Sequence, residues 1–207
     1  MAQPTDIAKA LVLADKRFGA VVEQFGPPPA RKAIKPALRF PQLCRAILHQ
    51  QLAGSAAAAI TGRVWALAGG PPTPEFLLDT DPELIRACGV SGAKLSSLLD
   101  LARHVESGAI ALPKLARLDD ATVIEQLVDV KGIGPWTAQM FLMSALARHD
   151  VWPVLDYGVR AGWSTLARHD GLIAPKALEA EGERFRPWRS SVAWYCWQIA
   201  DDAKTKK

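Results

Sequence analysis

The sequence predicts an all-α protein, and three observations lead to this fold class. Alanine and leucine, both strong helix formers, occupy 34 and 24 of the 207 positions, whereas Val, Ile and Thr together occupy 31. Apolar residues recur with helical spacing wherever a pattern is clear, and no stretch of four or more residues alternates as a strand does. A composition of 49% hydrophobic and 22% charged residues indicates a globular core. Whole-chain disorder and collagen-like architecture are therefore excluded.

The N-terminal half contains four helical patterns. A first apolar stripe, which the Gly-Pro-Pro-Pro segment at 26–29 ends, consists of Ile7, Leu11, Ala14 and Phe18. A second stripe of Leu43, Ala46 and Ile47 leads to residues 49–52, and the alanine-rich segment 55–68 predicts a third helix. A fourth helix is expected at Asp81-Pro82-Glu83, because a capping carboxylate, a proline in the first turn and early negative charge favour a helix start.

The C-terminal half continues in the same way. A strongly amphipathic helix is predicted from the helical spacing of Leu95, Leu98, Leu99, Ala102 and Val105. Another helix is expected to begin at Asp119 or Asp120, and the next to run from Pro135 to Leu146 with most sides buried. A last helix is expected to pass through Val192, Cys196 and Ile199 before a polar tail at 201–207. The patterns together predict eight to eleven short helices.

Charge and cysteine content narrow the class of protein. A net charge of +4 and a pI near 9.1 permit a polyanionic partner without requiring one. Three widely spaced cysteines without a CxxC pair support neither a disulfide framework nor a cysteine-ligated metal site. No apolar run reaches the roughly 18 residues of a membrane span, and a signal peptide is not recognisable. We therefore expect a reduced, cytoplasmic protein without a membrane segment.

The most informative segment is 127–138, in which a helix leads into Gly132 and Gly134 and Pro135 starts the next helix. Glycine permits positive φ and a close approach of the backbone to another surface. The N–H groups of Gly134 and of the following first turn are expected to be unpaired at the positive end of a helix, which is a natural phosphate site. An ordinary tight turn between helices favours the same residues, so on these grounds both interpretations stand equally.

Together with three further motifs, this segment resembles the helix–hairpin–helix of the base-excision DNA glycosylase superfamily, HhH-GPD. The segment 151–160, Val-Trp-Pro-Val-Leu-Asp-Tyr-Gly-Val-Arg, resembles the Gly/Pro-containing loop with the family's essential Asp. The block 45–54 resembles its second DNA-facing element, and Arg186-Pro187-Trp188-Arg189-Ser190 matches a late motif of the alkylpurine branch, the 3-methyladenine DNA glycosylase II proteins. The resemblance implies one compact unit of two helical lobes flanking a DNA-binding cleft, with roughly 40–115 in one lobe and 1–39 plus 116–207 in the other.

The resemblance makes Asp156 the catalytic residue. Cleavage of an N-glycosidic bond develops positive charge on the deoxyribose, which an ionised carboxylate beside C1′ stabilises, and the same carboxylate can orient or deprotonate the attacking water. From the residues alone, Asp156 is more simply the N-cap of a helix that starts at Tyr157. The two roles are compatible. The family often has two acidic residues here, whereas Leu155 precedes the single Asp156 in this chain.

The aromatic residues of these motifs suggest the type of reaction. Trp136 occupies the position at which bifunctional members carry a lysine, and an indole cannot form a Schiff base, so the resemblance implies hydrolysis without lyase activity. Trp136, Tyr157 and Trp188 are candidates for a pocket that holds a flipped, positively charged alkylpurine by stacking and cation–π contact. Core packing is the alternative for each of them, and we expect it for some of Trp163, Trp194 and Trp197.

The block 45–54 and the hairpin supply the candidate DNA contacts. By resemblance, Gln51 enters the duplex to fill the gap left by the flipped nucleotide, with Leu52 as its neighbour or alternative wedge and Gln50 beside them. A polar helix end is the simpler interpretation of this trio. Lys131, Gly132 and Gly134 are candidate phosphate contacts, with solvated surface charge as the alternative for Lys131.

Cofactor use is the least visible property in the sequence. The hairpin of this superfamily commonly holds a monovalent cation, Na⁺ or K⁺, and by resemblance the ligands would be the backbone carbonyls of Val128, Val130 and Ile133. No required cofactor is expected. The four histidines show no spacing with carboxylates or cysteines that suggests a transition metal.

The resemblance implies that the protein is a monofunctional DNA glycosylase. It is expected to act as a monomer on double-stranded DNA, to flip a damaged, alkylated purine and to hydrolyse its N-glycosidic bond, in the cytoplasm and at the nucleoid if the source is prokaryotic. Two alternatives stay open at this point. One is a helix–hairpin–helix protein that binds lesions or abasic sites without catalysis, and the other is a glycosylase for uracil, hypoxanthine or an oxidised purine.

Overall fold

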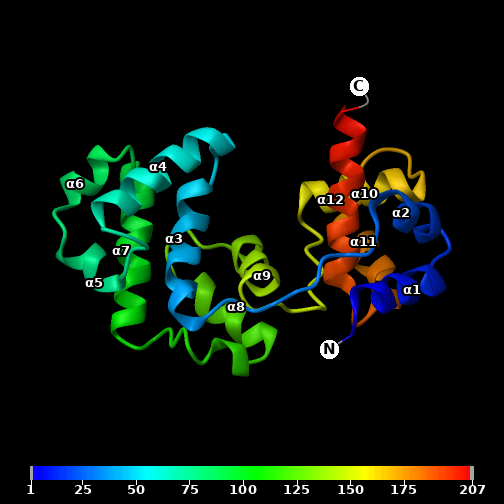
Figure 1. Cartoon of the computed structure of the whole chain (residues 1–207), viewed down its shortest axis with the longest axis horizontal. Helices are drawn as coiled ribbons and strands as arrows, with labels where there is room; N and C mark the ends of the chain where they lie inside the picture. The colour runs from blue at the N-terminus through cyan, green and yellow to red at the C-terminus, as the bar shows by residue number, and fades with distance from the viewer. Residues whose placement is uncertain (1, 206–207) are drawn as a thin grey trace. The chain divides into compact units, whose positions relative to one another are not determined.

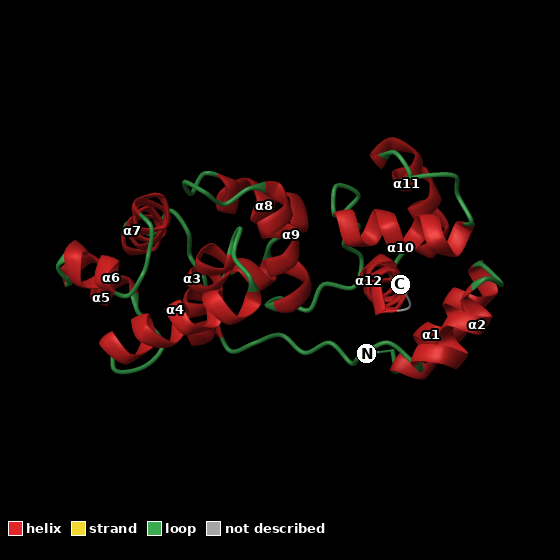
Figure 2. Ribbon diagram, turned by 90° about the horizontal axis from the view of Figure 1, so that it is seen from above, coloured by secondary structure: helices red, strands yellow, loops and turns green. Residues whose placement is uncertain are grey.

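The computed structural model describes residues 2–205, and helices are the only regular secondary structure in this part of the chain (Figure 1). It contains twelve α-helices and three short 3₁₀ turns, and Figure 2 shows only helices and loops among the described residues. The predicted all-α class is confirmed. The number of helices exceeds the predicted eight to eleven, because short helices such as α5 (Pro74–Asp79) and α11 (Pro175–Gly182) carry too few apolar positions to show a period.

The chain forms two compact units, which we call the central unit (33–146) and the terminal unit (1–32 and 147–207, described for 2–32 and 147–205). The helices of the central unit are α3 (Arg39–His49), α4 (Gly54–Leu67), α5, α6 (Pro82–Ala87), α7 (Gly92–Glu106), α8 (Asp120–Val128) and α9 (Pro135–Ser144), with 3₁₀ turns at Pro36–Leu38 and Leu115–Arg117. Several start signals act as predicted. Asp81 accepts a hydrogen bond from Glu83 N, and Asp119 accepts one from Thr122 N.

The terminal unit combines the two ends of the chain. It contains α1 (Pro4–Ala14), α2 (Phe18–Phe25), α10 (Tyr157–Ala167), α11, a 3₁₀ turn at Glu183–Phe185 and α12 (Arg189–Thr205). Its core is rich in aromatic rings. The ring centroid of Phe18 lies 5.4 Å from that of Phe185 and 5.7 Å from that of Tyr195, and the ring centroid of Trp163 lies 5.6 Å from that of Phe185. Trp163 is 1% exposed, so core packing is confirmed for this tryptophan.

Residues 116–146 belong to a different unit from the one the sequence suggested. They were expected to join 1–39 and 147–207, but α8 and α9 belong to the central unit together with α3 and α7, as do residues 33–39. The cause is local. The α8–α9 hairpin is hydrogen-bonded to side chains from α7 and from the end of α3, and α9 buries Phe141 and Leu142 in the central core.

The helices at the two ends of the chain differ most from the predicted boundaries, whereas α4 and α9 differ by one or two residues. The first apolar stripe is divided between α1 and α2, because Asp15 leaves the helical conformation and its carboxylate accepts a hydrogen bond from Arg17 N. The last helix continues through most of the predicted polar tail to Thr205, supported by an ion pair between Lys204 and Asp201 at 2.8 Å. Lys206 and Lys207 lie outside the described residues.

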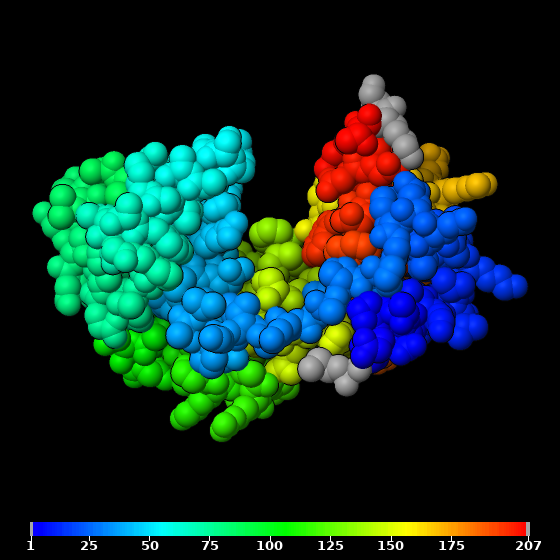
Figure 3. Space-filling view, viewed as in Figure 1, coloured from blue at the N-terminus to red at the C-terminus, as the bar shows by residue number. Residues whose placement is uncertain are grey.

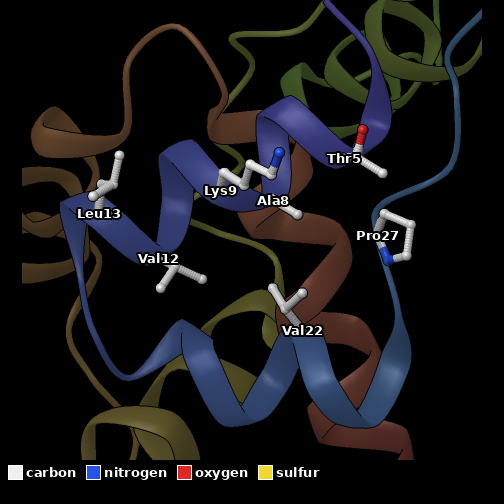
Figure 4. Close-up of a pocket in the computed structure, with 7 residues that line it drawn as sticks. All are labelled: Thr5, Ala8, Lys9, Val12, Leu13, Val22 and Pro27. Atoms are coloured by element: carbon white, nitrogen blue, oxygen red, sulfur yellow. The ribbon is translucent and has the colours of Figure 1, made fainter.

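Helices α1 and α2 form a continuous part of the terminal unit's surface in the space-filling view (Figure 3). An apolar groove of about 590 Å³ lies along these two helices, and Leu13, which projects beside it, is 87% exposed (Figure 4). None of the candidate catalytic, base-binding, DNA-binding or cation-binding residues lines this groove.

Candidate active site and DNA-binding elements

Asp156 is the N-cap of α10, as the sequence predicts. Its Oδ1 accepts hydrogen bonds from Val159 N at 2.8 Å and from the indole Nε1 of Trp197 at 2.9 Å. The residue is only 9% exposed. A carboxylate that is largely removed from water and receives two N–H donors on one oxygen is held in a fixed orientation, which is the property that electrostatic catalysis requires.

Helix α12 reaches Asp156 because α10 carries glycines on the facing side. A Cβ at Gly158 would lie 2.7 Å from Cδ1 of Trp197, and a Cβ at Gly162 would collide with the backbone of Cys196. The pKa of the Cys196 thiol is raised, first by burial and further by the negative charge of Asp156. The two glycines, one helical turn apart, therefore bring the indole of Trp197 within hydrogen-bond distance of the carboxylate.

The segment 186–190 anchors the loop that leads to Asp156. Arg189 binds the carboxylate of Asp150 through Nε at 2.7 Å and Nη2 at 3.0 Å, and Arg186 binds it at 2.9 Å. Ser190 Oγ accepts a hydrogen bond from Val151 N at 3.0 Å and donates one to Arg148 O at 2.9 Å. These contacts fix the start of the loop, so the polar residues of this motif position Asp156 from a distance.

The aromatic residues proposed for the base pocket occupy different surroundings. Tyr157 is 68% exposed at the first turn of α10, beside the equally exposed Leu155. Trp188 is half-buried and its ring packs edge-on against His149, with 5.4 Å between the ring centroids. Trp197, a residue for which core packing was expected, contacts Asp156 through its indole N–H. The glycine two residues after Asp156 was the available signal, because it indicates a close approach to α10 without identifying the partner.

Of the two glycines in the α8–α9 hairpin, only Gly132 uses the positive φ that glycine permits. Gly132 has φ +81°, and a Cβ at this position would collide with Ser97 Oγ. Gly134 has φ −95° and is the N-cap of α9, so it needs no special backbone conformation. The space beside Gly134 is open, because a Cβ there would meet nothing within 4 Å. An anion can therefore approach the positive end of α9 closely.

Side chains from two neighbouring elements hold the hairpin. Gln50 Nε2 donates a hydrogen bond to the carbonyl of Gly132 at 2.9 Å. On the other side, the backbone N–H of Lys131 donates to Asp100 Oδ2 at 2.8 Å, and Lys131 Nζ donates to Ser96 Oγ at 2.9 Å. The structure thus brings together Gln50, Lys131 and Gly132, which the sequence suggested independently. It places the ammonium of Lys131 against α7.

A hollow of about 450 Å³ lies between the end of α3 and α9, and its lining includes Ala46, His49, Gln50, Gln51, Trp136, Thr137 and Met140. Trp136 is 46% exposed, so a broad aromatic surface is accessible at this hollow. Gln51 has φ +55°, a conformation that is uncommon for a residue with a side chain and often marks a functional turn. Leu52, which follows it, is 40% exposed.

His49 is the titratable residue of this hollow. Its pKa is lowered by burial and by the nearby positive charges of Arg45 and Lys94, so the imidazole is neutral at physiological pH. A neutral side chain does not repel a cationic ligand, whereas a protonated one would.

The hairpin carbonyls have the chemistry that a monovalent cation requires. Backbone oxygens are hard ligands, and those of Val130 and Ile133 belong to buried residues, whereas Val128 is 36% exposed. The carbonyl of Val130 also accepts a hydrogen bond from Ile133 N at 3.0 Å and keeps a second lone pair. Within residues 2–205, no group of three or more His, Cys, Asp or Glu side chains forms a metal site. In the same range, no helix is both long and apolar enough to span a membrane.

Comparison with known proteins gives one family match. The sequence profile described as HhH-GPD superfamily base excision DNA repair protein matches residues 44–187. DNA-3-methyladenine glycosylase 1 of Schizosaccharomyces pombe is 36% identical over 188 residues, covering 89% of this chain and 81% of that protein. DNA-3-methyladenine glycosylase 2 of Escherichia coli is 30% identical and covers 80% of this chain and 61% of that protein.

Solved structures give the same result. The 3-methyladenine DNA glycosylase of S. pombe in complex with abasic DNA superposes with a TM-score of 0.83 at 33% identity, covering 93% of this chain and 95% of that chain. The DNA-3-methyladenine glycosidase of Bacillus halodurans superposes with a TM-score of 0.86 at 35% identity, covering 97% and 91%.

Proposed function

Because this chain belongs to the HhH-GPD superfamily of base excision DNA repair proteins, we propose that it is a DNA glycosylase that excises alkylated purines. The observation that carries this proposal is the fixed carboxylate of Asp156. The residue is 9% exposed, and its carboxylate accepts hydrogen bonds from Val159 N and Trp197 Nε1. The similarity to 3-methyladenine DNA glycosylases over most of their length supports the substrate class.

In the proposed reaction, the bond between C1′ of the deoxyribose and the purine nitrogen breaks and its electron pair leaves with the base. A purine that carries positive charge through alkylation departs as a neutral molecule, so it needs no strong general acid. Asp156 stabilises the positive charge that develops on the sugar, and a water molecule supplies the hydroxyl group at C1′ and gives up its other proton to the Asp156 carboxylate or to solvent. The carboxylate can act without reorientation because its N–H donors already fix it.

The proposed chemistry is hydrolysis without strand cleavage. A lyase reaction requires an amine that attacks C1′, and Trp136 occupies the position that would have to supply it. Trp136 instead offers an exposed aromatic face in a hollow of about 450 Å³ beside the neutral His49. Stacking and cation–π contact with this face would favour a cationic alkylpurine, with Tyr157 and Trp188 as further proposed base contacts.

The DNA contacts follow from the hairpin and the α3–α4 turn. Gly134 and the first turn of α9 would bind a phosphate, while Gln51 or Leu52 would fill the space that the flipped nucleotide leaves in a duplex. A monovalent cation held by the carbonyls of Val128, Val130 and Ile133 would add positive charge beside that phosphate. We propose that one chain acts alone on cellular DNA, in the cytoplasm and at the nucleoid if the source is a prokaryote.

The test is release of 3-methyladenine from methylated duplex DNA by the purified protein, followed by chromatography of the freed bases. The proposal predicts free alkylpurine and an abasic strand that breaks only after alkali treatment. Binding to abasic duplex without release of any base would overturn the enzymatic assignment. Release of uracil, hypoxanthine or an oxidised purine, without release of alkylpurines, would overturn the substrate class.

A further inference from the structure

Asp100 lies on α7, and its carboxylate is hydrogen-bonded to the hairpin. Oδ2 accepts the backbone N–H of Lys131 at 2.8 Å, and the side chain is 28% exposed. Lys131 is the residue directly before Gly132, where the chain adopts φ +81°. Asp100 therefore contacts the hairpin at the point where the backbone changes direction.

The bond from Asp100 is one of two side-chain hydrogen bonds that hold consecutive residues of the hairpin, Lys131 and Gly132. The N–H of Lys131 is held from α7 by Asp100, and the carbonyl of Gly132 is held from the end of α3 by Gln50 at 2.9 Å. Neither bond uses the N–H of Gly134, whose surroundings are open. The two side chains thus fix the turn while the face at the start of α9 stays accessible to an anion.

If only its charge mattered, the Asp100 carboxylate would weaken DNA binding. A negative charge beside an element that binds phosphate repels DNA, and its removal should strengthen binding. A hydrogen bond from a backbone N–H to a carboxylate is stronger than one to a neutral acceptor, and the loss of such a partner is costly for the N–H group that remains. The two effects have opposite signs, so one substitution can distinguish them.

We propose that Asp100 is a positioning residue for the glycosylase reaction. It holds the hairpin in the conformation that binds the phosphate of the lesion strand, and its acceptor oxygen strengthens DNA binding through this contact although its charge opposes binding. The inference rests on the proposed function of the hairpin as a phosphate site.

The experiment compares four variants of the full chain. Asp100→Ala removes both the charge and the acceptor, Asp100→Asn removes the charge and keeps an acceptor oxygen, and Asp100→Glu keeps the charge but displaces it by one methylene. Asp129→Ala is the matched control. Asp129 is an exposed residue two positions before Lys131, and its side chain makes no hydrogen bond within the described part of the chain.

The measurements are the Kd for a duplex with an abasic-site analogue at several salt concentrations, the thermal midpoint, and the single-turnover rate of base release at saturating enzyme. We expect Asp100→Ala to weaken binding about tenfold. The slope of log Kd against log salt should decrease by about one, which corresponds to the loss of one phosphate contact. Asp100→Glu should also weaken binding, Asp100→Asn should bind as the wild type or more tightly, and Asp129→Ala should bind about twofold more tightly. The rate at saturation should stay near that of the wild type, since the loss lies in DNA binding.

Several results would overturn the inference. If Asp100→Ala binds as tightly as Asp129→Ala, the carboxylate acts only as a charge. If Asp100→Ala does not fold, wild-type affinity and salt slope in Asp100→Glu would contradict the positioning role. Failure of the proposed function is recognised separately, because it would appear as absence of base release by the wild type. If the wild-type protein does not bind the abasic duplex, both the function and this inference fail.

Discussion

The indole Nε1 of Trp197 donates a hydrogen bond to Oδ1 of Asp156 over 2.9 Å, and the same oxygen accepts Val159 N at 2.8 Å. One donor belongs to the helix that Asp156 caps and the other to α12. The carboxylate is therefore fixed both by its own helix and by a neighbouring one. Its orientation depends on how closely α12 packs against α10, which Gly158 and Gly162 permit.

Replacing Trp197 by Phe should lower the rate of base release more than it lowers DNA affinity. Phenylalanine keeps most of the ring but removes the N–H donor, and a lost hydrogen bond to a charged group of about 1.5–3 kcal/mol corresponds to a rate loss of roughly 10- to 100-fold. The measurement is the single-turnover rate on methylated duplex DNA. Trp194→Phe is the control, because this half-buried residue on the same helix contacts Tyr195, with 4.8 Å between ring centroids. Equal rates for the two variants would contradict the role of Trp197.

Gly162→Ala should destabilise the protein. Its new Cβ would collide with the backbone of Cys196, and α10 and α12 would have to separate, with an expected cost of about 1–3 kcal/mol in the free energy of unfolding. Urea denaturation provides the measurement. Gly19→Ala on α2 is the matched control, since a Cβ there meets nothing within 4 Å, and this change should leave stability unchanged or raise it. Equal midpoints for both variants would show that the close helix contact is unimportant.

Gln50→Leu should weaken binding to an abasic duplex about fivefold, because the carbonyl of Gly132 loses its hydrogen-bond donor and the hairpin is less well positioned. Titration of a labelled duplex measures this change. Gln126→Leu on α8 provides the comparison, since the side chain of Gln126 makes no hydrogen bond among the described residues. If Gln50→Leu binds DNA like the wild type, Gln50 neither supports the hairpin nor contacts DNA.

The pKa of His49 predicts a pH dependence of stability. Because burial and the charges of Arg45 and Lys94 lower its folded-state pKa below the ordinary value of 6.5, the unfolded chain binds the proton more readily. Stability should be fully present above pH 6.5 and should fall as the pH decreases from 6.5 towards the lowered value. His149, whose pKa is lowered by burial and by Arg31, adds a change of the same sign.

Thermal midpoints between pH 8 and pH 5 test this expectation in the wild type and in His49→Gln. The variant should lose less stability on acidification than the wild type does. A parallel decrease in both proteins would show that His49 does not titrate with a lowered pKa.

The fold could be predicted where local signals act alone. Asp81, Asp119 and Asp156 cap helices as their sequence context indicates, and the apolar stripe at 95–105 lies in α7 with its apolar face buried. The division into units could not be predicted in this way. It depends on long-range contacts such as Gln50 with Gly132 and Asp100 with Lys131, which no periodicity reveals.

The candidate site could be predicted only in part, because some of its residues are brought together by long-range contacts. Motifs identify Asp156, Gly132 and Gln50 because their residue types and spacing are distinctive along the chain. Trp197 lies 41 positions after Asp156, and its identity as the second donor follows from the packing of α12 on α10. Asp100 is likewise an ordinary exposed position of an amphipathic helix until the hairpin is folded against it.

The central claim is that the Asp156 carboxylate accelerates cleavage of the N-glycosidic bond, and the single-turnover rate of 3-methyladenine release by Asp156→Asn tests it most directly. Asparagine keeps an oxygen that can accept Val159 N and cap α10, so the fold and the affinity for abasic duplex should be retained. We expect the rate to fall by about 10² to 10³ or more, because the negative charge that stabilises the developing cation is lost. Release by the variant at the wild-type rate would contradict the account.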